Sequence, residues 1–151
     1  MKGKILVLPK STFDDVMQNH GIIDENVENE PFAFISIESG TSGNHYFKNN
    51  HANVLNLNFD DIGPDIKLSY PNLTLFSDEQ AKEIIRFWKA NKGKKFIIHC
   101  TAGISRSGAV GNFIRQVEEI DYEDFIQDNP NLLPNGWVLK VLNDVYQNSF
   151  S

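Results

Sequence analysis

The residues best suited to chemistry lie between His99 and Gly108, where the sequence reads His-Cys-Thr-Ala-Gly-Ile-Ser-Arg-Ser-Gly. Five residues separate Cys100 from Arg106. An apolar run over 95–99 comes directly before the cysteine and predicts a buried strand. Apolar residues then recur at helical spacing, at Val110, Phe113, Ile114 and Val117. The pattern predicts a loop that leaves a strand at Cys100 and enters a helix near Arg106.

A loop of this kind can hold an anion, because the first N–H groups of a helix lack intrahelical partners and the helix dipole adds about half a positive charge there. Arg106 adds a forked, permanently charged donor that can bind two phosphate oxygens at once. The same field lowers the pKa of a thiol from about 8.5 to between about 3.5 and 7.5, so we expect Cys100 to be a thiolate. Ser107 can donate a hydrogen bond to that sulfur. These residues predict a phosphate-binding loop with Cys100 as its nucleophile.

Two residues of this segment also have ordinary structural explanations. A lone cysteine is often a small buried hydrophobe, but the preceding apolar run, the glycine in the spacer and the Arg-Ser pair together favour the nucleophile. His99 either forms a hydrogen bond near the thiolate or simply ends the strand. The sequence leaves both interpretations of His99 open.

Composition limits the classes of protein that could carry this loop. The chain has 151 residues, a formal net charge of −6 and a hydrophobic fraction of 40%, which fit one packed domain over 1–151. The acidic balance disfavours nucleic acid as a partner, and no apolar stretch fits a membrane span or a signal peptide. A single cysteine excludes an internal disulfide and a multi-thiolate metal site. We therefore expect a soluble, cytoplasmic, monomeric protein.

Strands and helices alternate along the chain. Strand patterns cover 4–9, 32–37, 53–59 and 95–99. Helices are expected near 13–17, after a capping box at Ser77–Gln80, after Arg106 and from Trp137 onward, whereas 39–51 has the composition of a surface loop. This alternation predicts an α/β fold, with a mostly parallel central sheet of about four to five strands and helices on both faces. Such sheets bind ligands at the carboxyl ends of their strands, where Cys100 stands.

The string His99–Ser107 matches the His-Cys-x5-Arg-Ser/Thr signature of the cysteine-dependent protein tyrosine phosphatases, and its Ala-Gly-Ile-Ser-Arg-Ser part resembles the dual-specificity branch. Three further stretches are similar to that branch, namely 34–37, 57–61 and 134–137. The resemblance covers most of the chain from about residue 32 onward. It implies the fold of a single dual-specificity phosphatase-like domain.

The resemblance also implies a two-step transfer through a phosphocysteine. Cys100 attacks phosphorus, Arg106 holds the equatorial oxygens, and an aspartic acid protonates the leaving oxygen. Further phosphate-binding groups are the main-chain amides of Thr101, Ala102, Gly103, Ile104, Ser105 and Arg106. Ser107 steadies the sulfur as a leaving group. This chemistry requires no metal or cofactor, because Arg106 and the loop dipoles stabilise the charge.

Two adjacent carboxylates compete for the role of the acid. Asp60 and Asp61 point to opposite sides of an extended chain, so normally only one of them reaches the substrate. The resemblance to the alternating strand of the dual-specificity branch, with Leu57 and Phe59 aligned, implies Asp61, while Asp60 and then Asp65 stay as alternatives. Both could instead cap the turn into Ile62-Gly63-Pro64. Asp61 and Cys100 stand 39 positions apart, more than is usual in the dual-specificity branch, which makes 63–76 an insertion.

The uncharged spacer over 101–105 favours a phosphorylated protein as the substrate. One alternative is a phosphatase for a non-protein phosphoester, such as a phosphoinositide, an inositol phosphate or an RNA 5′ end. Another is a catalytically silent pseudophosphatase that only binds phosphotyrosine. Tyr46, Phe47 and Tyr70 either wall the pocket against a phenyl ring or pack elsewhere. Specificity for phosphotyrosine alone, or also for phosphoserine and phosphothreonine, depends on a pocket depth that the sequence does not give.

Overall fold

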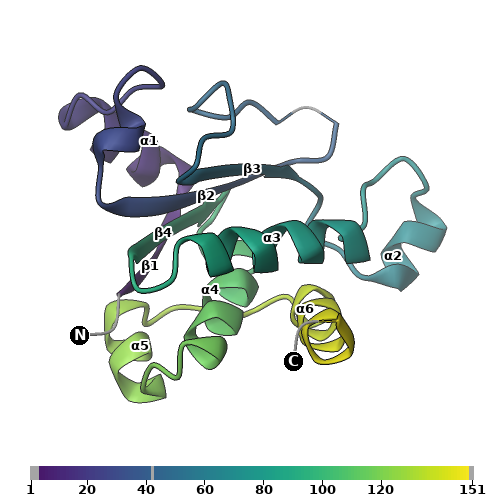
Figure 1. The fold of residues 1–151 in the computed structure, drawn as a ribbon. Coiled ribbons are helices and arrows are strands. Elements are labelled where there is room, and N and C mark those ends of the chain that lie inside the picture. Colours follow the sequence, from purple (N-terminus) through teal and green to yellow (C-terminus); the bar gives the residue numbers. More distant parts are fainter. Residues whose placement is uncertain (1–3, 42, 150–151) are drawn as a thin grey trace.

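Four parallel strands form the central sheet of the computed structural model (Figure 1), which describes residues 4–41 and 43–149. In sheet order the strands are β1 (Ile5–Pro9), β4 (Lys95–Cys100), β2 (Phe32–Glu38) and β3 (Val54–Asn58). All three pairings are parallel. The central strands β4 and β2 are buried along nearly their whole length, as expected where helices cover both faces. The predicted parallel α/β sheet is confirmed.

Helices cover both faces of this sheet (Figure 1). They are α1 (Lys10–Asn19), α2 (Pro64–Ser69), α3 (Asp78–Ala90), α4 (Arg106–Val117), α5 (Tyr122–Asp128) and α6 (Gly136–Ser149), with a 3₁₀ turn at Val27–Asn29. Helix α1 lies on one face, and α3, α4, α5 and α6 lie on the other. In the described ranges, no helix is both long and apolar enough to cross a membrane.

Two apolar clusters fill the space between the sheet and these helices. The alternation of side chains along a strand divides the residues of β2, so that Phe34 joins the cluster under α1 and Ile35 joins the larger cluster under α3, α4 and α6. Phe13 of α1 is fully buried and lies edge-on to Phe34. The larger cluster takes Trp88 from α3 and Phe113 from α4. The two clusters pack on opposite faces of β4, the strand that ends at Cys100.

The capping box predicted at the start of α3 is present. Ser77 accepts a hydrogen bond from the Gln80 backbone N–H, and the Gln80 side chain accepts one from the Ser77 N–H. The same Gln80 amide donates to the Asn58 carbonyl at the end of β3. The cap therefore fixes both the start of α3 and its position against the sheet.

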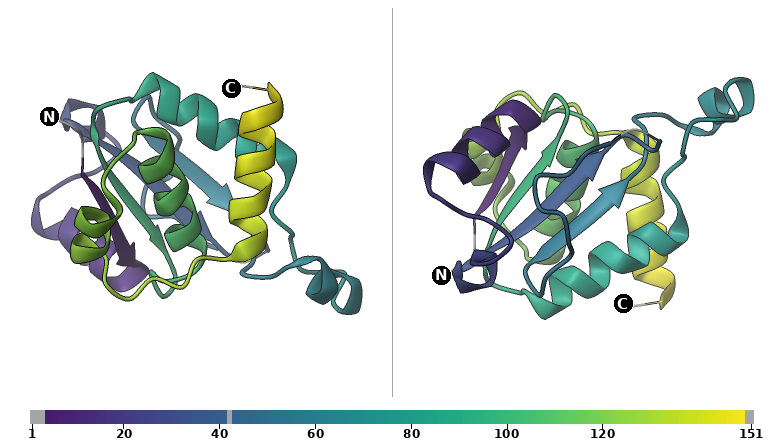
Figure 2. Two further views of the ribbon diagram at one scale, coloured as in Figure 1. Left: turned by 90° about the horizontal axis from the view of Figure 1, so that it is seen from below. Right: turned by 90° about the horizontal axis from the view of Figure 1, so that it is seen from above.

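The sequence patterns do not predict two short helices, α2 and α5. Helix α5 is only seven residues long, and its N-terminus depends on Asp121, whose carboxylate accepts from the Glu123 and Asp124 N–H groups. Helix α2 lies inside the stretch 63–76 and starts with Pro64 at its first turn. Figure 2 shows that α2 projects from the body of the protein. The helix predicted near 13–17 is longer, since α1 starts directly after β1. Of the predicted loop over 39–51, residue 42 lies outside the described residues.

Candidate active site

The loop between β4 and α4 is packed tightly against the end of β1. Gly103 has φ +70°, and a Cβ atom there would lie 2.4 Å from both the Leu8 carbonyl carbon and the Pro9 nitrogen. The Lys10 N–H donates to the Thr101 carbonyl at 3.2 Å. Glycine is therefore required at position 103 both for its backbone conformation and for lack of space. The junction of β1 and α1 supports the outer side of the loop.

The structure places Cys100 at the base of this loop, with 2% of its surface exposed. Its Sγ atom lies 2.9 Å from the Ser107 hydroxyl oxygen. Burial alone would raise the pKa of the thiol, but hydrogen bonds from the Ser107 hydroxyl and from the backbone of Ser107, Gly103 and Ile104 outweigh it, and the pKa is lowered. The loop thus converges on the sulfur with donors that stabilise a negative charge.

Arg106 is 6% exposed and its guanidinium is held on two sides. One terminal nitrogen donates to the Phe59 carbonyl at 2.9 Å, and the other donates to the Thr101 hydroxyl at 3.0 Å. Phe59 comes directly before the two candidate acids. Arg106 therefore connects the loop between β4 and α4 to the turn that carries Asp60 and Asp61.

The two neighbouring aspartates have different partners. Asp60 accepts hydrogen bonds from the Gly40 and Thr74 N–H groups, so its carboxylate holds the segments around these two residues together. Asp61 accepts at Oδ1 from the Ser105 hydroxyl at 2.7 Å and from the Asn135 side-chain amide at 2.8 Å. Ser105 belongs to the loop between β4 and α4. Of the two aspartates, Asp61 is therefore the one whose carboxylate contacts this loop. Asp65 lies in the first turn of the projecting helix α2.

His99 is fully buried and belongs to a chain of polar contacts rather than to the sulfur. Its Nε2 atom lies 2.7 Å from the Ser36 hydroxyl, which is 2.6 Å from Nδ1 of His45, and Nε2 of His45 contacts Asn58. Burial lowers the pKa of His99 to about 3, so the imidazole is neutral at pH 7. In the described ranges, no group of three or more His, Cys, Asp or Glu side chains is arranged to hold a metal ion.

Two of the three aromatic side chains considered for the pocket wall pack in other contacts. Phe47 is fully buried in the cluster under α1, and the Tyr46 hydroxyl donates to the Ile22 carbonyl at 2.6 Å. Tyr70 is largely exposed at the end of α2. The packing interpretation therefore holds for Tyr46 and Phe47.

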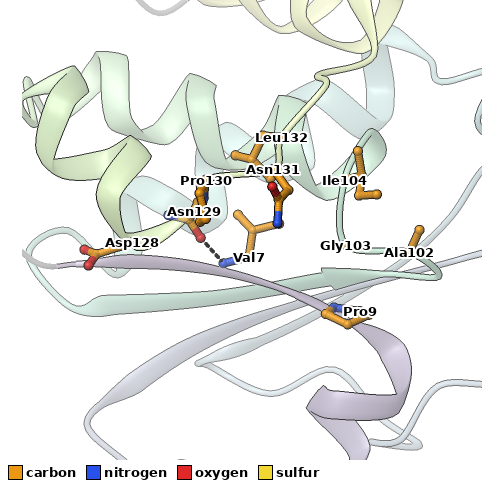
Figure 3. A pocket seen from close by; sticks show the side chains of 10 residues that line it. All are labelled: Val7, Pro9, Ala102, Gly103, Ile104, Asp128, Asn129, Pro130, Asn131 and Leu132. Atoms are coloured by element: carbon orange, nitrogen blue, oxygen red, sulfur yellow. Dashed lines mark hydrogen bonds between the residues drawn. The ribbon is translucent and has the colours of Figure 1, made fainter.

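A hollow borders the same loop from the side of β1. Figure 3 shows this pocket of about 260 Å³, which is lined by residues of β1, by 102–104 of the loop and by 128–132. Asn129 lies beside Val7 in this lining, and its side-chain oxygen accepts from the Val7 N–H at 2.8 Å. Neither Cys100, Arg106 nor Asp61 lines this pocket. It is therefore a different surface of the loop from the one on which the donors converge.

The sequence patterns single out Cys100, Arg106, Ser107 and Asp61, and the structure brings all four to this loop. The sequence patterns do not reveal that Asn135 contacts Asp61. The signal for Asn135 is its place in Pro-Asn-Gly-Trp before α6, where its side-chain oxygen accepts from the Val138 N–H as a helix cap. The contact with Asp61, 74 residues away, is visible only in three dimensions.

The geometry of the loop predicts the effect of one added methyl group. We expect Gly103→Ala to lower the turnover of phosphate esters about 100-fold, because the loop must move to relieve the contact of the added Cβ with Leu8 and Pro9. Gly21→Ala is the matched control, since Gly21 also has positive φ, +64°, but has no atom within 4 Å of an added Cβ. Turnover and thermal unfolding of both variants are measured together. An equal loss of turnover in both would contradict the steric explanation.

The lowered pKa of Cys100 predicts how its alkylation depends on pH. Only the thiolate reacts with iodoacetate, so the reaction rate should rise with pH to a midpoint below the ordinary value for a cysteine. Ser107→Ala removes the strongest of the hydrogen bonds that lower this pKa and should move the midpoint upward. The measurement is the alkylation rate across pH for both proteins. If the alkylation rate of the unmodified protein has the midpoint of an ordinary cysteine, Cys100 is not a stabilised thiolate.

Comparisons with known proteins find likeness at the level of structure. No protein-family model matches the sequence, and no curated protein matches it significantly. Tk-PTP in its active form is 17% identical, with a TM-score of 0.49, over 97% of this chain and 94% of that one. The human tyrosine phosphatase-like serine/threonine/tyrosine-interacting protein is 18% identical, with a TM-score of 0.43, over 95% and 87%. PTPMT1 in complex with PI(5)P is 17% identical, with a TM-score of 0.48, over 95% and 90%. The His-Cys-x5-Arg-Ser string of this chain resembles the signature of the cysteine-dependent protein tyrosine phosphatases.

Proposed function

We propose that this protein hydrolyses phosphotyrosine in proteins through a phosphocysteine intermediate. One observation carries the proposal: the Cys100 sulfur lies in a ring of loop donors, and the Asp61 carboxylate is bound to the rim of that same loop at Ser105. A nucleophile, an anion cradle and a proton donor within one loop are the three parts that phosphoester cleavage needs.

In the first step the Cys100 thiolate attacks phosphorus and the S–P bond forms. The bond from phosphorus to the phenolic oxygen breaks, and its electron pair stays on that oxygen. Protonated Asp61 gives its proton to the departing oxygen, so a neutral tyrosine leaves. Arg106 and the loop amides hold the three equatorial oxygens, whose charge is spread in the transition state.

In the second step water attacks the phosphocysteine. Asp61, now a carboxylate, takes a proton from the water as the new O–P bond forms. The S–P bond breaks and its electron pair returns to Cys100, where the Ser107 hydroxyl, 2.9 Å away, stabilises the thiolate. Inorganic phosphate leaves, and Asp61 is protonated again for the next cycle. The scheme uses no metal or cofactor, because Arg106 and the amides stabilise the charge.

The charges around the loop support a substrate with a single phosphate. The spacer over 101–105 is uncharged. Two lysines lie on adjoining segments, and both ammonium groups are already bound: Lys10 contacts Glu38 at 2.9 Å, and Lys67 donates to the Pro71 and Leu73 carbonyls. Each lysine would have to give up these contacts to bind the additional phosphates of an inositol headgroup. This favours a phosphorylated protein over a phosphoinositide, an inositol phosphate or an RNA 5′ end.

The composition of the site also supports an enzyme over a phosphotyrosine-binding module. Cys100, Arg106 and Asp61 are all present, and each has partners that fix its position. A pseudophosphatase that only binds phosphotyrosine would not need Asp61 in a position to transfer a proton. We further propose that residues 1–151 act as one phosphatase domain, as a monomer in the cytoplasm, with phosphorylated protein as partner and without nucleic acid or membrane.

Turnover of three substrates tests this proposal. The unmodified protein should release phosphate from a phosphotyrosine peptide, with less or no release from a phosphothreonine peptide and from phosphoinositide micelles. Cys100→Ser should abolish turnover and still bind phosphate, because the loop donors stay in place. A preference for phosphoinositide would establish the non-protein alternative. Absence of turnover on all three, with retained phosphotyrosine binding, would favour the binding module and refute hydrolysis.

The partners of the two aspartates predict which one transfers the proton. Asp61→Ala should lower kcat by about 10² to 10⁴ on phenyl phosphate and far less on p-nitrophenyl phosphate, whose leaving group needs no proton. Asp60→Ala should mainly lower the thermal stability, because it frees the Gly40 and Thr74 N–H groups. The measurement is kcat on both esters for both variants. A leaving-group-dependent loss in Asp60→Ala would transfer the role to Asp60.

A further inference from the structure

The carboxylate of Asp61 is bound through one of its two oxygens. Both hydrogen bonds, from the Ser105 hydroxyl and from the Asn135 amide, end on Oδ1. Among the described residues, Oδ2 has no hydrogen-bond donor. Asp61 itself is exposed and lies between β3 and the projecting helix α2, so the strand alone does not fix its side chain. The two donors are what hold the carboxylate at the rim of the loop.

Asn135 is the better fixed of these donors. Its backbone N–H donates to the Ser105 carbonyl at 3.0 Å, and its side-chain oxygen accepts from the Val138 N–H at 3.0 Å. Because the cap occupies the oxygen, the amide cannot be reversed without losing it. The side-chain nitrogen must therefore face Asp61, at 2.8 Å, and it also reaches the Ile62 carbonyl at 3.3 Å.

We infer that Asn135 is a positioning residue for the proton transfer, which holds Oδ1 of Asp61 so that Oδ2 carries the proton. This inference rests on the proposed function and deepens it. In the protonated acid, Oδ1 is the carbonyl oxygen, which still accepts from both donors, and Oδ2–H is free to donate to the leaving oxygen. After that transfer Oδ2 is the base that takes the proton from water. The hold on Oδ1 stays the same throughout the cycle.

A neutral amide suits this role better than a charged side chain would. Asp61 must be protonated in the first step and ionised in the second, so its holder must bind both forms. A lysine or arginine in this place would favour the ionised carboxylate and oppose the protonated acid. Asn135 donates a hydrogen bond in either state. The Asn135 backbone N–H donates a hydrogen bond to the Ser105 carbonyl, so Asp61 and the phosphate-binding loop are held as one unit.

The test separates positioning from the helix cap. Asn135→Ser keeps a side-chain oxygen that can cap α6 and removes the amide that holds Asp61. We expect kcat on phenyl phosphate to fall about 10- to 100-fold, while kcat on p-nitrophenyl phosphate and the inhibition constant of inorganic phosphate stay within about twofold. The matched control, Asn131→Ser, changes an exposed asparagine of the same segment and should match the unmodified protein.

A double-mutant cycle decides the outcome. If Asn135 acts through Asp61, Asn135→Ser should have no further effect on kcat in an Asp61→Ala background. Equal losses on both esters, or a full additional loss in that background, would overturn the inference and show a structural role. Thermal unfolding of each variant reports whether the cap is kept. If the unmodified protein turns over neither ester, the proposed function fails; if it is active and Asn135→Ser is equally active, only this inference fails.

Discussion

The site depends on the balance between burial and hydrogen bonding at one sulfur atom. Burial opposes a negative charge on Cys100, and the donors from Ser107, Gly103 and Ile104 more than compensate for it. That compensation requires the loop to keep its shape, which the contact of Gly103 with the end of β1 enforces. The remaining architecture, from the parallel sheet to the helix α4, serves to bring those donors to one point.

A second level of organisation connects separate parts of the chain to the loop. Arg106 donates a hydrogen bond to the Phe59 carbonyl, just before the turn that carries Asp61. Asn135 donates hydrogen bonds to Asp61 and to the Ser105 carbonyl. Residues from the end of β3, from the loop and from the start of α6 thus meet within a few ångströms. Since each connection is a directed hydrogen bond, the relative positions of the proposed nucleophile, anion donors and acid are set by hydrogen-bond geometry rather than by general packing.

Local patterns predicted the fold well, because most elements bury a regular face. The strands ending at Cys100 and Asn58, and the helices α3, α4 and α6, all follow from apolar spacing and a capping box. Helices α2 and α5 escaped, since each is short and stabilised by a proline or an aspartate at its start rather than by an apolar stripe. The spacing of Cys100 and Arg106 indicated the loop, but the different partners of Asp60 and Asp61 and the role of Asn135 depend on contacts across the chain.

The projecting segment that contains α2 is closed at its root. Asp60 and Thr74 exchange two hydrogen bonds, with the Asp60 N–H donating to the Thr74 carbonyl and the Thr74 N–H donating to the Asp60 carboxylate. Residues 63–73, which follow Asp61 and Ile62, are tethered at this root like the arc of a hairpin, so their number and composition can change while Asp61 keeps its place. Evolution, or a protein engineer, can therefore exchange this appendage without moving the residues of the proposed site.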